Sequence, residues 1–576
     1  MALVILPFLI IMASVGVIPA PANAAAASQT DALLEWKASL SNVTALSGWT
    51  RGAPVCTWHG VACDAAGRVA TLWLMSSGLR GSLDALDFAA LPALVELELN
   101  GNNFTGAIPA SISRLRSLTL LDLGNNGFHG SIPPQLSDLS GLVDLRLYNN
   151  HLKGSFPEFV LKNSNITFLN LSLNNFSGPV PESLPEKLPN LTFLGLSGNA
   201  FSGRIPASLG RLTKLQELWI SSNLLSENKL KGDIPPAFFT NWPELTVFDV
   251  RSNMHTGSIP PEVGKASQLE VLSMGDNTLS GGIPADLGSL TSLVYLDLSD
   301  NNLIGGIPAA LGSLTSLVYL DLSANNLTGG IPSDLGHFSN LGFLNLSYNY
   351  ISGPILGNLG NNFKLQGVDS SGNSSNNSSG ATFCRPQLSL MILDLSNNKL
   401  TGKLPECWWN LPNLQFMDLS NNYFSGEIPT VQTSYNCSLQ SVHLAGNSFT
   451  GVFPSALRGC STLVTLDIGN NKFFGDIPPW IGKGLPSLKI LSLKSNNFTG
   501  GIPSELSHLS HLQLLDMTNN GLTGIIPRSF GDLTSMKNPK IISSRGSLDG
   551  STYQDRIDII WKGQELIFQK TLQLMT

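Results

Sequence analysis

The sequence predicts a solenoid of the α/β type, a superhelix with short parallel strands on its concave face and a small, helical, disulfide-closed cap at its N-terminal end. Three observations predict it. Two nearly identical stretches, "LGSLTSLVYLDLSDNN" from Leu287 and "LGSLTSLVYLDLSANN" from Leu311, stand 24 residues apart. A short "LxL" recurs at about this period, and an asparagine follows it two residues later, from Asn102 to Asn520. A fixed period of this length is typical of stacked repeats.

The first 24 residues, "MALVILPFLIIMASVGVIPAPANA", form an apolar run that ends in an A-x-A arrangement at Ala22 and Ala24. This pattern predicts a secretory signal peptide over residues 1–24. The run lacks a basic start and contains Pro7, so an uncleaved anchor is the alternative. No later segment approaches the ~20 apolar residues that span a bilayer. We expect a secreted or cell-surface protein, anchored in the plasma membrane in a full-length form.

A cap is expected over residues 28–69. Leu33, Trp36 and Leu40 share one face of a predicted helix. Cys56 and Cys63 are close in sequence, and a bridge between them would fix a small lid over the apolar edge of the first repeat.

The repeat array is expected over residues 70–530, in about nineteen repeats. Alternating residues such as Leu296 and Leu298 point inward from a short strand, whereas Asp297 points to the open face as a solvated residue. The asparagine is expected to bond backbone groups of adjoining turns. Since no repeat can bury its own leucine face, only stacking makes a core. A bulge near residues 224–229 interrupts the period.

Two further cysteine pairs, Cys384 with Cys407 and Cys437 with Cys460, are each separated by 23 residues, about one repeat. Stacking places residues one repeat apart at roughly the ~5 Å strand spacing, which suits a disulfide. The spacing therefore predicts two more local bridges. Zinc is the rival interpretation, but no C-x2-C pair with nearby partners supports it.

Composition and motifs exclude several functions. Only 13% of residues are charged and the net charge is -7, which argues against nucleic acid as a partner. Zincin, nucleotide-binding and kinase motifs are missing. His443 is expected on the concave face, outside any metal-ligand spacing. We predict a protein that is not an enzyme, with no catalytic residues, cofactor or metal.

The consensus "LxxLxxLDLSxNxLxGxIPxxLGxL", together with "DALLEWKASL" and "CTWHGVAC" before it, resembles the plant-type leucine-rich repeat and the N-terminal cap of plant leucine-rich-repeat receptors. The more charged stretch 531–571 resembles the island of receptor-like proteins, with a β-hairpin expected from the alternation of Ile557, Ile559 and Trp561. Residues 572–576 would begin a further repeat. The resemblance implies a C-terminally truncated receptor.

The resemblance implies an extracellular ligand-recognition module of a plant receptor-like protein or kinase, in defence or developmental signalling. Its partners would be a peptide, a wall-derived fragment or a protein ligand, and a co-receptor kinase ectodomain. The alternative is a secreted inhibitor of a wall-degrading hydrolase, similar to polygalacturonase-inhibiting proteins, which have fewer repeats. A structural role, as in an ice-binding protein, would need a flat, regular face.

Candidate ligand-binding residues are the aromatic and charged side chains at outward strand positions. Glu217 and Trp219 stand on one strand, and Asp249 and Arg251 are expected on the second strand after it, counted by the asparagine steps 223 and 253; Tyr295 and Tyr319 follow. Such side chains often anchor interfaces. Alternatively, Trp219 covers the bulge and the tyrosines are duplicated consensus residues.

Thirteen N-x-S/T sequons are candidate glycosylation sites. Two of them, at Asn170 and Asn345, occupy outward strand positions, so their glycans would border a free lane on the concave face. The full set is Asn42, Asn103, Asn165, Asn170, Asn175, Asn190, Asn326, Asn345, Asn373, Asn376, Asn377, Asn436 and Asn497.

Overall fold

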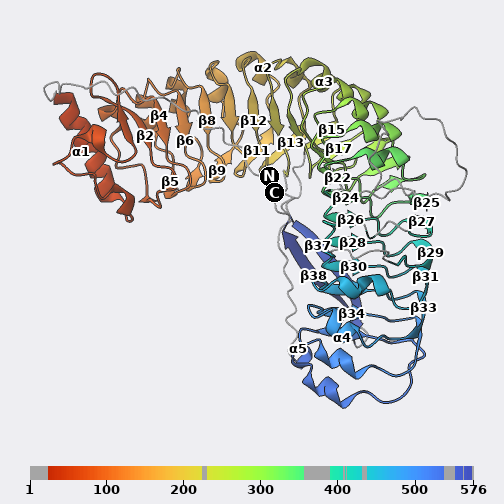
Figure 1. Ribbon diagram of the computed structural model, residues 1–576. Helices are drawn as coiled ribbons and strands as arrows, with labels where there is room; N and C mark the ends of the chain where they lie inside the picture. Colours follow the sequence, from red (N-terminus) through yellow and green to blue (C-terminus); the bar gives the residue numbers. More distant parts are fainter. Residues whose placement is uncertain are drawn as a thin grey trace, which may run out of the picture. The chain divides into compact units, whose positions relative to one another are not determined.

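The computed structural model describes residues 24–222, 230–355, 389–405, 409, 411–430, 437–537, 552–561 and 564–573. The chain forms two compact units, one of Pro21–Leu390 and the other of Met391–Thr576 grouped with Met1–Ala20. Both contain stacked coils of a repeat (Figure 1). The signal peptide, the bulge near residues 224–229 and the Cys384–Cys407 pair lie outside the described residues and stay predictions. None of the described helices is long and apolar enough to cross a bilayer.

The cap begins with helix α1 (Ala24–Ser39). Leu33, Trp36 and Leu40 are buried, which confirms the predicted face. The Trp36 indole donates to the carbonyl of Ser82 and stacks on Phe104, with ring centroids 5.8 Å apart. The first repeats therefore pack against the cap through aromatic side chains. Two short 3₁₀ helices, η1 (Thr44–Leu46) and η2 (Val55–Thr57), complete the cap.

The predicted cap disulfide is present between Cys56 and Cys63, whose Cα atoms are 5.5 Å apart. It joins η2 to strand β1 (Val61–Cys63), which pairs antiparallel with the first repeat strand, β2 (Val69–Trp73). The bridge thus ties the cap to the edge of the repeat sheet.

In the unit Pro21–Leu390 each repeat contributes one short strand to a parallel sheet, and neighbours pair in register. After β2 these strands are β4 (Glu96–Glu98), β6 (Leu120–Asp122), β8 (Asp144–Arg146), β10 (Phe168–Asn170), β12 (Phe193–Gly195), β14 (Glu217–Trp219), β16 (Val247–Asp249), β18 (Val271–Ser273), β20 (Tyr295–Asp297), β22 (Tyr319–Asp321) and β24 (Phe343–Asn345).

A second set of short strands follows the first in each repeat, again parallel to its neighbours. These are β3 (Arg80–Gly81), β5 (Asn103–Gly106), β7 (Gly127–Gly130), β9 (His151–Gly154), β11 (Asn175–Pro179), β13 (Ala200–Arg204), β15 (Leu230–Asp233), β17 (Met254–Thr256), β19 (Ser280–Gly281), β21 (Asn302–Gly305), β23 (Asn326–Leu327) and β25 (Ser352–Pro354).

The return path of a repeat is a short helix, usually 3₁₀, that commonly starts just after the "IP" proline. Proline fixes φ and lacks an N–H, so it suits the start of a helix but not its interior. The helices are η3 (Phe88–Ala90), η4 (Ala110–Arg114), η5 (Pro134–Asp138), η6 (Val160–Lys162), α2 (Leu184–Lys187), η7 (Ala207–Arg211), α3 (Ala237–Asn241), η8 (Pro261–Lys265), η9 (Ala285–Ser289), η10 (Ala309–Ser313) and η11 (Ser333–His337).

The unit Met391–Thr576 repeats this plan. Its first strands are β26 (Ile392–Asp394), β28 (Phe416–Asp418), β30 (Ser441–His443), β32 (Thr465–Asp467), β34 (Ile490–Ser492) and β36 (Leu514–Asp516); its second strands are β27 (Lys399–Gly402), β29 (Tyr423–Glu427), β31 (Ser448–Gly451), β33 (Lys472–Asp476) and β35 (Asn497–Thr499). Its helices are η14 (Ser455–Gly459), α4 (Ile481–Gly484), η15 (Ser504–His508), η16 (Arg528–Asp532) and α5 (Thr534–Lys537).

Two predictions about this unit are confirmed. Cys437 and Cys460 form a disulfide with Cα atoms 4.9 Å apart, as stacking by one repeat requires. The expected hairpin consists of β37 (Thr552–Trp561) and β38 (Gln564–Gln573), which pair antiparallel with Ile557 opposite Phe568.

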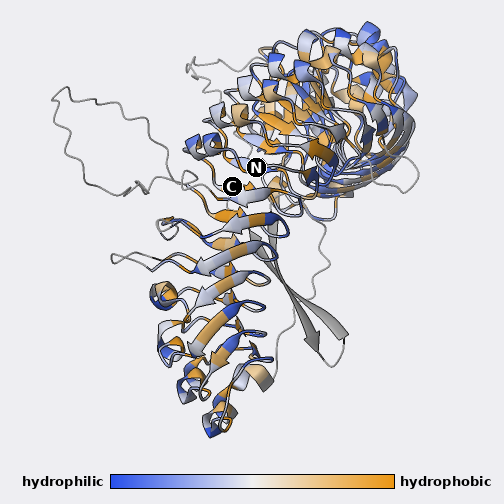
Figure 2. Cartoon of the chain, turned by 90° about the vertical axis from the view of Figure 1, so that its right-hand side faces the viewer, coloured by the Kyte–Doolittle hydropathy of each residue, from blue (hydrophilic) through white to orange (hydrophobic). Residues whose placement is uncertain are grey.

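The core lies inside the coils. In both units most inward leucines of the strands are fully or almost fully buried, for example Leu296 and Leu491, whereas Leu515 on β36 is half-buried. Figure 2 shows hydrophobic residues recurring from coil to coil within each unit. Because the apolar face of one coil is covered by the next, the core is a continuous column within each unit.

The asparagines of the repeat form a hydrogen-bond ladder between coils. Asn301 is 7% exposed; its Nδ2 lies within 3.3 Å of the carbonyls of Met274, Leu298 and Ser299, and its Oδ1 accepts from the amide of Leu279. The other ladder asparagines likewise donate from Nδ2 to backbone carbonyls, although Oδ1 of Asn253 has no partner among the described residues. They are Asn102, Asn126, Asn150, Asn174, Asn199, Asn253, Asn277, Asn325, Asn349, Asn398, Asn422, Asn447, Asn471, Asn496 and Asn520.

We predict that Asn301→Ala lowers the free energy of unfolding by on the order of 2–4 kcal/mol, because it leaves buried backbone groups of two coils without a partner. The matched control is Asn302→Ala, one residue along, whose side chain is exposed; it should change stability by less than about 0.5 kcal/mol. Chemical denaturation followed by circular dichroism measures both. Equal losses in the two variants would contradict the ladder as a source of stability.

One core position holds a histidine. His255 is fully buried where other repeats have Phe104 or Leu279. Its Nδ1 lies 3.1 Å from the carbonyl of Gly232, whereas its Nε2 is buried and has no hydrogen-bond partner among the described residues. Burial lowers the pKa of His255 to about 4, against the opposing effect of the Gly232 carbonyl.

We therefore predict that His255→Leu stabilises the protein, and most strongly in acid. The unfolded chain binds a proton near pH 6.5 but the folded chain only near pH 4, so stability falls as pH decreases through that window, by about 3 kcal/mol for this group. Denaturant midpoints at pH 7 and pH 4.5 test it, with the exposed His151→Leu as control. An unchanged pH dependence in His255→Leu would contradict the prediction.

Candidate functional site

The candidate residues gather on neighbouring strands of the unit Pro21–Leu390. Strand β14 pairs directly with β16, with Trp219 opposite Asp249. The prediction that Asp249 stands two strands beyond Trp219 is therefore wrong, because Asp249 stands on the next strand of the sheet. Strand β18 lies between β16 and β20 and contributes Ser273.

The parallel register arranges the outward side chains in rows that cross the strands. One row, here called the aromatic row, consists of Tyr295, Tyr319 and Phe343. The next, called the acidic row, consists of Asp249, Ser273, Asp297, Asp321 and Asn345. Two residues of one strand thus present an aromatic ring and a carboxylate side by side, as in Tyr295 and Asp297.

Trp219 and Glu217 stand next to each other on β14 at the edge of these rows. The Trp219 indole Nε1 donates to Glu217 Oε2 over 2.8 Å, and both side chains are half-buried. This bond orients the indole on the outward face. The alternative, in which Trp219 covers the bulge, involves residues outside the described part of the chain and stays open.

The aromatic row is a stack. The rings of Tyr295 and Tyr319 are 4.2 Å apart with planes at 9°, and those of Tyr319 and Phe343 are 4.2 Å apart at 7°. Burial raises the pKa of both tyrosines, so they stay neutral hydroxyls. The stack is a rigid, partly exposed surface with large contact area, which suits an interface.

The acidic row is more buried than predicted. Asp297 and Asp321 are 8% and 7% exposed, so the interpretation of these residues as solvated is wrong. Each carboxylate accepts from the amide and hydroxyl two residues on, Ser299 or Ser323. Neighbouring strands stand only about 5 Å apart, and the adjacent rows leave little room for water.

Asp321 has further neutral partners. Its Oδ2 accepts from Nδ2 of Asn345 at 3.2 Å and from the hydroxyl of Tyr319 at 3.4 Å. Burial, together with the charge of Asp297 on the next strand, raises the pKa of Asp321 to about 7. Burial also raises the pKa of Asp297. The two carboxylates disfavour being charged together in the absence of a cation.

Arg251 is the counter-charge at the other end of the row. Its Nε lies 3.5 Å from Asp249 Oδ2. Burial lowers the pKa of Arg251, but the carboxylates of Asp249 and Asp297 outweigh that effect and the net direction is upward. Burial raises the pKa of Asp249 in spite of this partner. Arg251 therefore stays charged and is committed mainly to Asp249.

A second charged cluster lies on strands β4 to β10 and was not predicted from the sequence. Arg146 donates to both oxygens of Asp144, at 2.9 and 2.6 Å, and its guanidinium lies 4.6 Å from the centre of the Phe168 ring. Burial raises the pKa of the nearby Asp122 to about 6. The sequence contained a signal for this cluster, because the outward positions of "DLR" hold two charges where most repeats hold one or none.

The sequons differ in access. Nδ2 of Asn345, the atom that a glycan would occupy, donates to Asp321, and the residue is buried. Asn170 on β10 is half-buried, whereas Asn103, Asn175 and Asn497 are exposed on second strands. Asn42, Asn165, Asn190 and Asn326 are also exposed; Asn373, Asn376, Asn377 and Asn436 lie outside the described residues.

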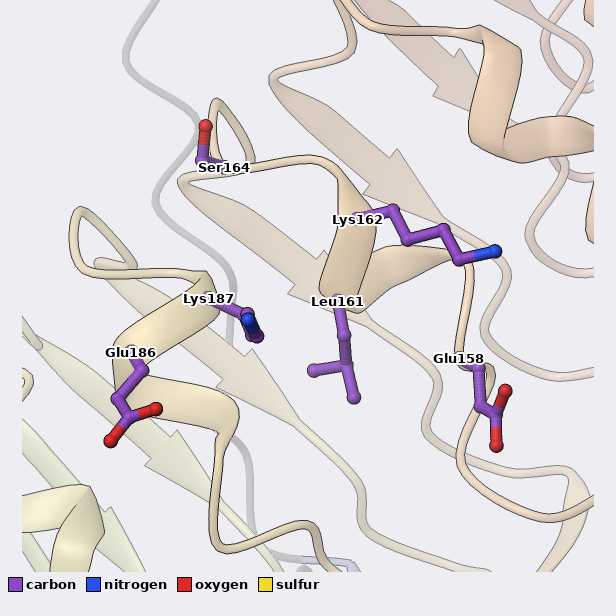
Figure 3. A pocket seen from close by; sticks show the side chains of 6 residues that line it. All are labelled: Glu158, Leu161, Lys162, Ser164, Glu186 and Lys187. Atoms are coloured by element: carbon purple, nitrogen blue, oxygen red, sulfur yellow. The ribbon is translucent and has the colours of Figure 1, made fainter.

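A surface hollow on the helical side is no candidate site. It is lined by Glu158, Leu161, Lys162, Ser164, Glu186 and Lys187. Figure 3 shows that Lys162 and Glu158 extend away from Leu161 rather than converging on one point. No residue of the aromatic or acidic row takes part. Among the described residues, no group of three or more His, Cys, Asp or Glu side chains could hold a metal ion.

Comparison with known families agrees with this architecture. Residues 26–64 match the family described as "Leucine rich repeat N-terminal domain". Two families described as leucine rich repeat match most of the remaining repeats, at residues 243–303, 373–424, 437–498, 472–522 and 486–538, and at 93–115, 117–139, 165–186, 190–212 and 316–338. The chain belongs to the leucine-rich-repeat family, and its repeats and cap are similar to those of the secreted or cell-surface ectodomains of plant receptors.

Several relatives and solved structures that are similar to this chain are plant receptors. A probable LRR receptor-like serine/threonine-protein kinase of Arabidopsis thaliana is 38% identical over 96 residues, 15% of this chain and 14% of that protein. The matched stretches thus span a small part of the curated relatives. The Arabidopsis HAESA ectodomain, solved with an N-terminally extended IDA peptide hormone, is 29% identical with a TM-score of 0.65, covering 88% of this chain and 92% of that one. A TDR receptor is 29% identical with a TM-score of 0.66, covering 79% and 81%.

We predict that Asp321→Ser reduces the loss of stability between acid and neutral pH. The folded chain holds this proton up to about pH 7, compared with 3.8 for the ordinary group. The contribution to stability is therefore complete below about pH 4 and lost as pH rises to about 7, up to about 4 kcal/mol. Denaturant midpoints at pH 5 and pH 8 measure the effect, with the exposed Asp286→Ser as control. Identical pH profiles for Asp321→Ser and the wild type would contradict it.

Proposed function

We propose that the chain is the extracellular ligand-recognition module of a plant leucine-rich-repeat receptor, acting in defence or developmental signalling, and that it binds a peptide along strands β14 to β24. It acts by binding and not by catalysis. The observation that carries the proposal is the row arrangement: Trp219, Arg251, the aromatic row and the acidic row occupy one stretch of one face.

Two further observations support a peptide ligand. The outward face of β14 to β24 offers stacked rings for apolar side chains and buried acceptors for backbone or side-chain donors. Structures similar to this chain were solved with peptide hormones: HAESA with IDA and the co-receptor SERK1, and RGFR1 with RGF2. A co-receptor ectodomain is accordingly a second proposed partner.

The test begins with selection of binders from a randomised peptide display library against the secreted protein. We expect Trp219→Ala and Arg251→Ala each to weaken the selected peptides by about 2 kcal/mol, roughly 30-fold, as anchor residues of interfaces do. Controls are Tyr423→Ala, an exposed aromatic residue on β29, and Arg114→Ala on η4. Titration by biolayer interferometry measures each affinity.

Two outcomes would contradict the proposal. Losses below about 0.5 kcal/mol in both variants, with normal circular dichroism, would place peptide binding elsewhere. Failure to enrich any peptide, while the protein is correctly folded, would count against a peptide ligand and favour the hydrolase-inhibitor alternative.

A further inference from the structure

We infer that the acidic row binds an arginine side chain of the ligand, with its guanidinium at Asp297 and Asp321. This inference rests on the proposed function and names the chemistry of one contact. Three independent observations lead to it. They are a buried hydroxyl without a partner, an excess of acidic over basic residues, and a contact elsewhere in the chain in which an arginine binds a carboxylate beside an aromatic ring.

The hydroxyl belongs to Ser273, between Asp249 and Asp297 in the acidic row. The residue is 2% exposed, and its Oγ has no hydrogen-bond partner among the described residues. A buried polar group left in this state costs about 1–3 kcal/mol. Its position on the outward face means that a donor arriving with a ligand could satisfy it, whereas the core on the other side of the strand is apolar.

The part of the chain that carries most of the acidic row has acidic residues but no lysine or arginine. The sequence contains no Lys or Arg between Lys265 and Lys364, a stretch that includes β18 to β24. The acids in the same stretch are Glu270, Asp276, Asp286, Asp297, Asp300, Asp321 and Asp334. Within the described residues, Asp297 and Asp321 form no ion pair; their hydrogen-bond partners there are serine, asparagine and tyrosine groups.

The carboxylate of Asp297 lies close to the backbone at the end of the neighbouring strand β18. Gly275 follows β18, and a Cβ at that position would lie 2.7 Å from Asp297 Oδ1. The missing side chain therefore gives Asp297 room beside Ser273. A guanidinium presents five N–H donors in a rigid, planar fork and can bond two acceptors on neighbouring strands at once, whereas the three donors of an ammonium group lack this fixed geometry.

The chain already makes this contact with an arginine of its own. Arg146 binds both oxygens of Asp144 while its guanidinium lies 4.6 Å from the Phe168 ring on the adjacent strand. Strands β20 to β24 also bring carboxylates and rings together, with Asp297 and Asp321 in one row and Tyr295 and Tyr319 in the row beside it, but without an arginine. We therefore expect a ligand arginine there, held by the carboxylates.

The direct test uses N-acetyl-arginine amide as the probe and N-acetyl-citrulline amide as its uncharged isostere. Saturation-transfer NMR on the secreted protein reports contact at millimolar probe concentration. We expect a signal from the arginine probe at least five-fold stronger than from the citrulline probe. We expect Asp297→Ser and Asp321→Ser each to reduce the arginine signal at least three-fold, because serine is the native residue at this strand position in Ser273 and Ser492. Asparagine is avoided, since Asp297→Asn and Asp321→Asn would each create an N-L-S sequon.

Asp286→Ser is the matched control, with the same change of charge on the exposed helix η9, where the next repeat carries Ala310; it should leave the signal unchanged. Ser273→Ala is a further variant. Because the Ser273 hydroxyl has no hydrogen-bond partner among the described residues, its removal should not destabilise the fold, but it should weaken the arginine signal about two-fold. Equal signals from arginine and citrulline, equal losses in Asp286→Ser and Asp297→Ser, or displacement of the probe by 1 mM calcium chloride would overturn the inference.

The inference and the proposed function fail separately. If selected peptides lose affinity in Trp219→Ala and Arg251→Ala but keep it when their own arginines are replaced by citrulline, peptide binding stands and the arginine contact is refuted. If the arginine probe binds at the acidic row but no peptide is enriched, the contact stands and the peptide proposal fails.

Discussion

Every coil of this protein depends on a neighbour for two things: cover for its leucine face and partners for its backbone. The ladder asparagines link both needs, since the Nδ2 of Asn301 bonds carbonyls of its own coil and of the preceding one. A buried carbonyl or amide without such a partner is costly. The asparagine therefore fixes the distance and register between coils, and the outward side chains inherit that register.

Register is what turns a repeated sequence into a site. Because consecutive strands pair residue by residue, positions 24 residues apart become neighbours, and Tyr295 lies against Tyr319 at 4.2 Å. Any outward residue that departs from the consensus is then placed in a row whose other members the sequence defines. The aromatic and acidic rows are consequences of the ladder, since they need no loop or helix to bring their members together.

The repeat architecture was predictable because its signals are periodic: the leucines, the asparagines and the cysteine spacing of Cys437 and Cys460 each specify one neighbour relation. The burial of the outward residues could not be predicted from the sequence in the same way. Asp297 looked like a solvated consensus residue, yet it is buried, because its burial depends on side chains of adjacent coils, such as tyrosines. The strand position of Asp249 was misjudged for a related reason, since a count of residues does not show which strands pair, and β14 and β16 are direct neighbours.

The buried carboxylates would make the proposed binding face specific although it has few charges. A carboxylate in open water gains little from one more cation, but one that is desolvated and next to another gains more, because the apo state already bears the cost of burial and mutual repulsion. Asp249 has Arg251 to offset that cost, whereas Asp297 and Asp321 rely on neutral donors. The stability lost in forming this pair of carboxylates is thus available to favour a cationic ligand group over a neutral one of the same shape.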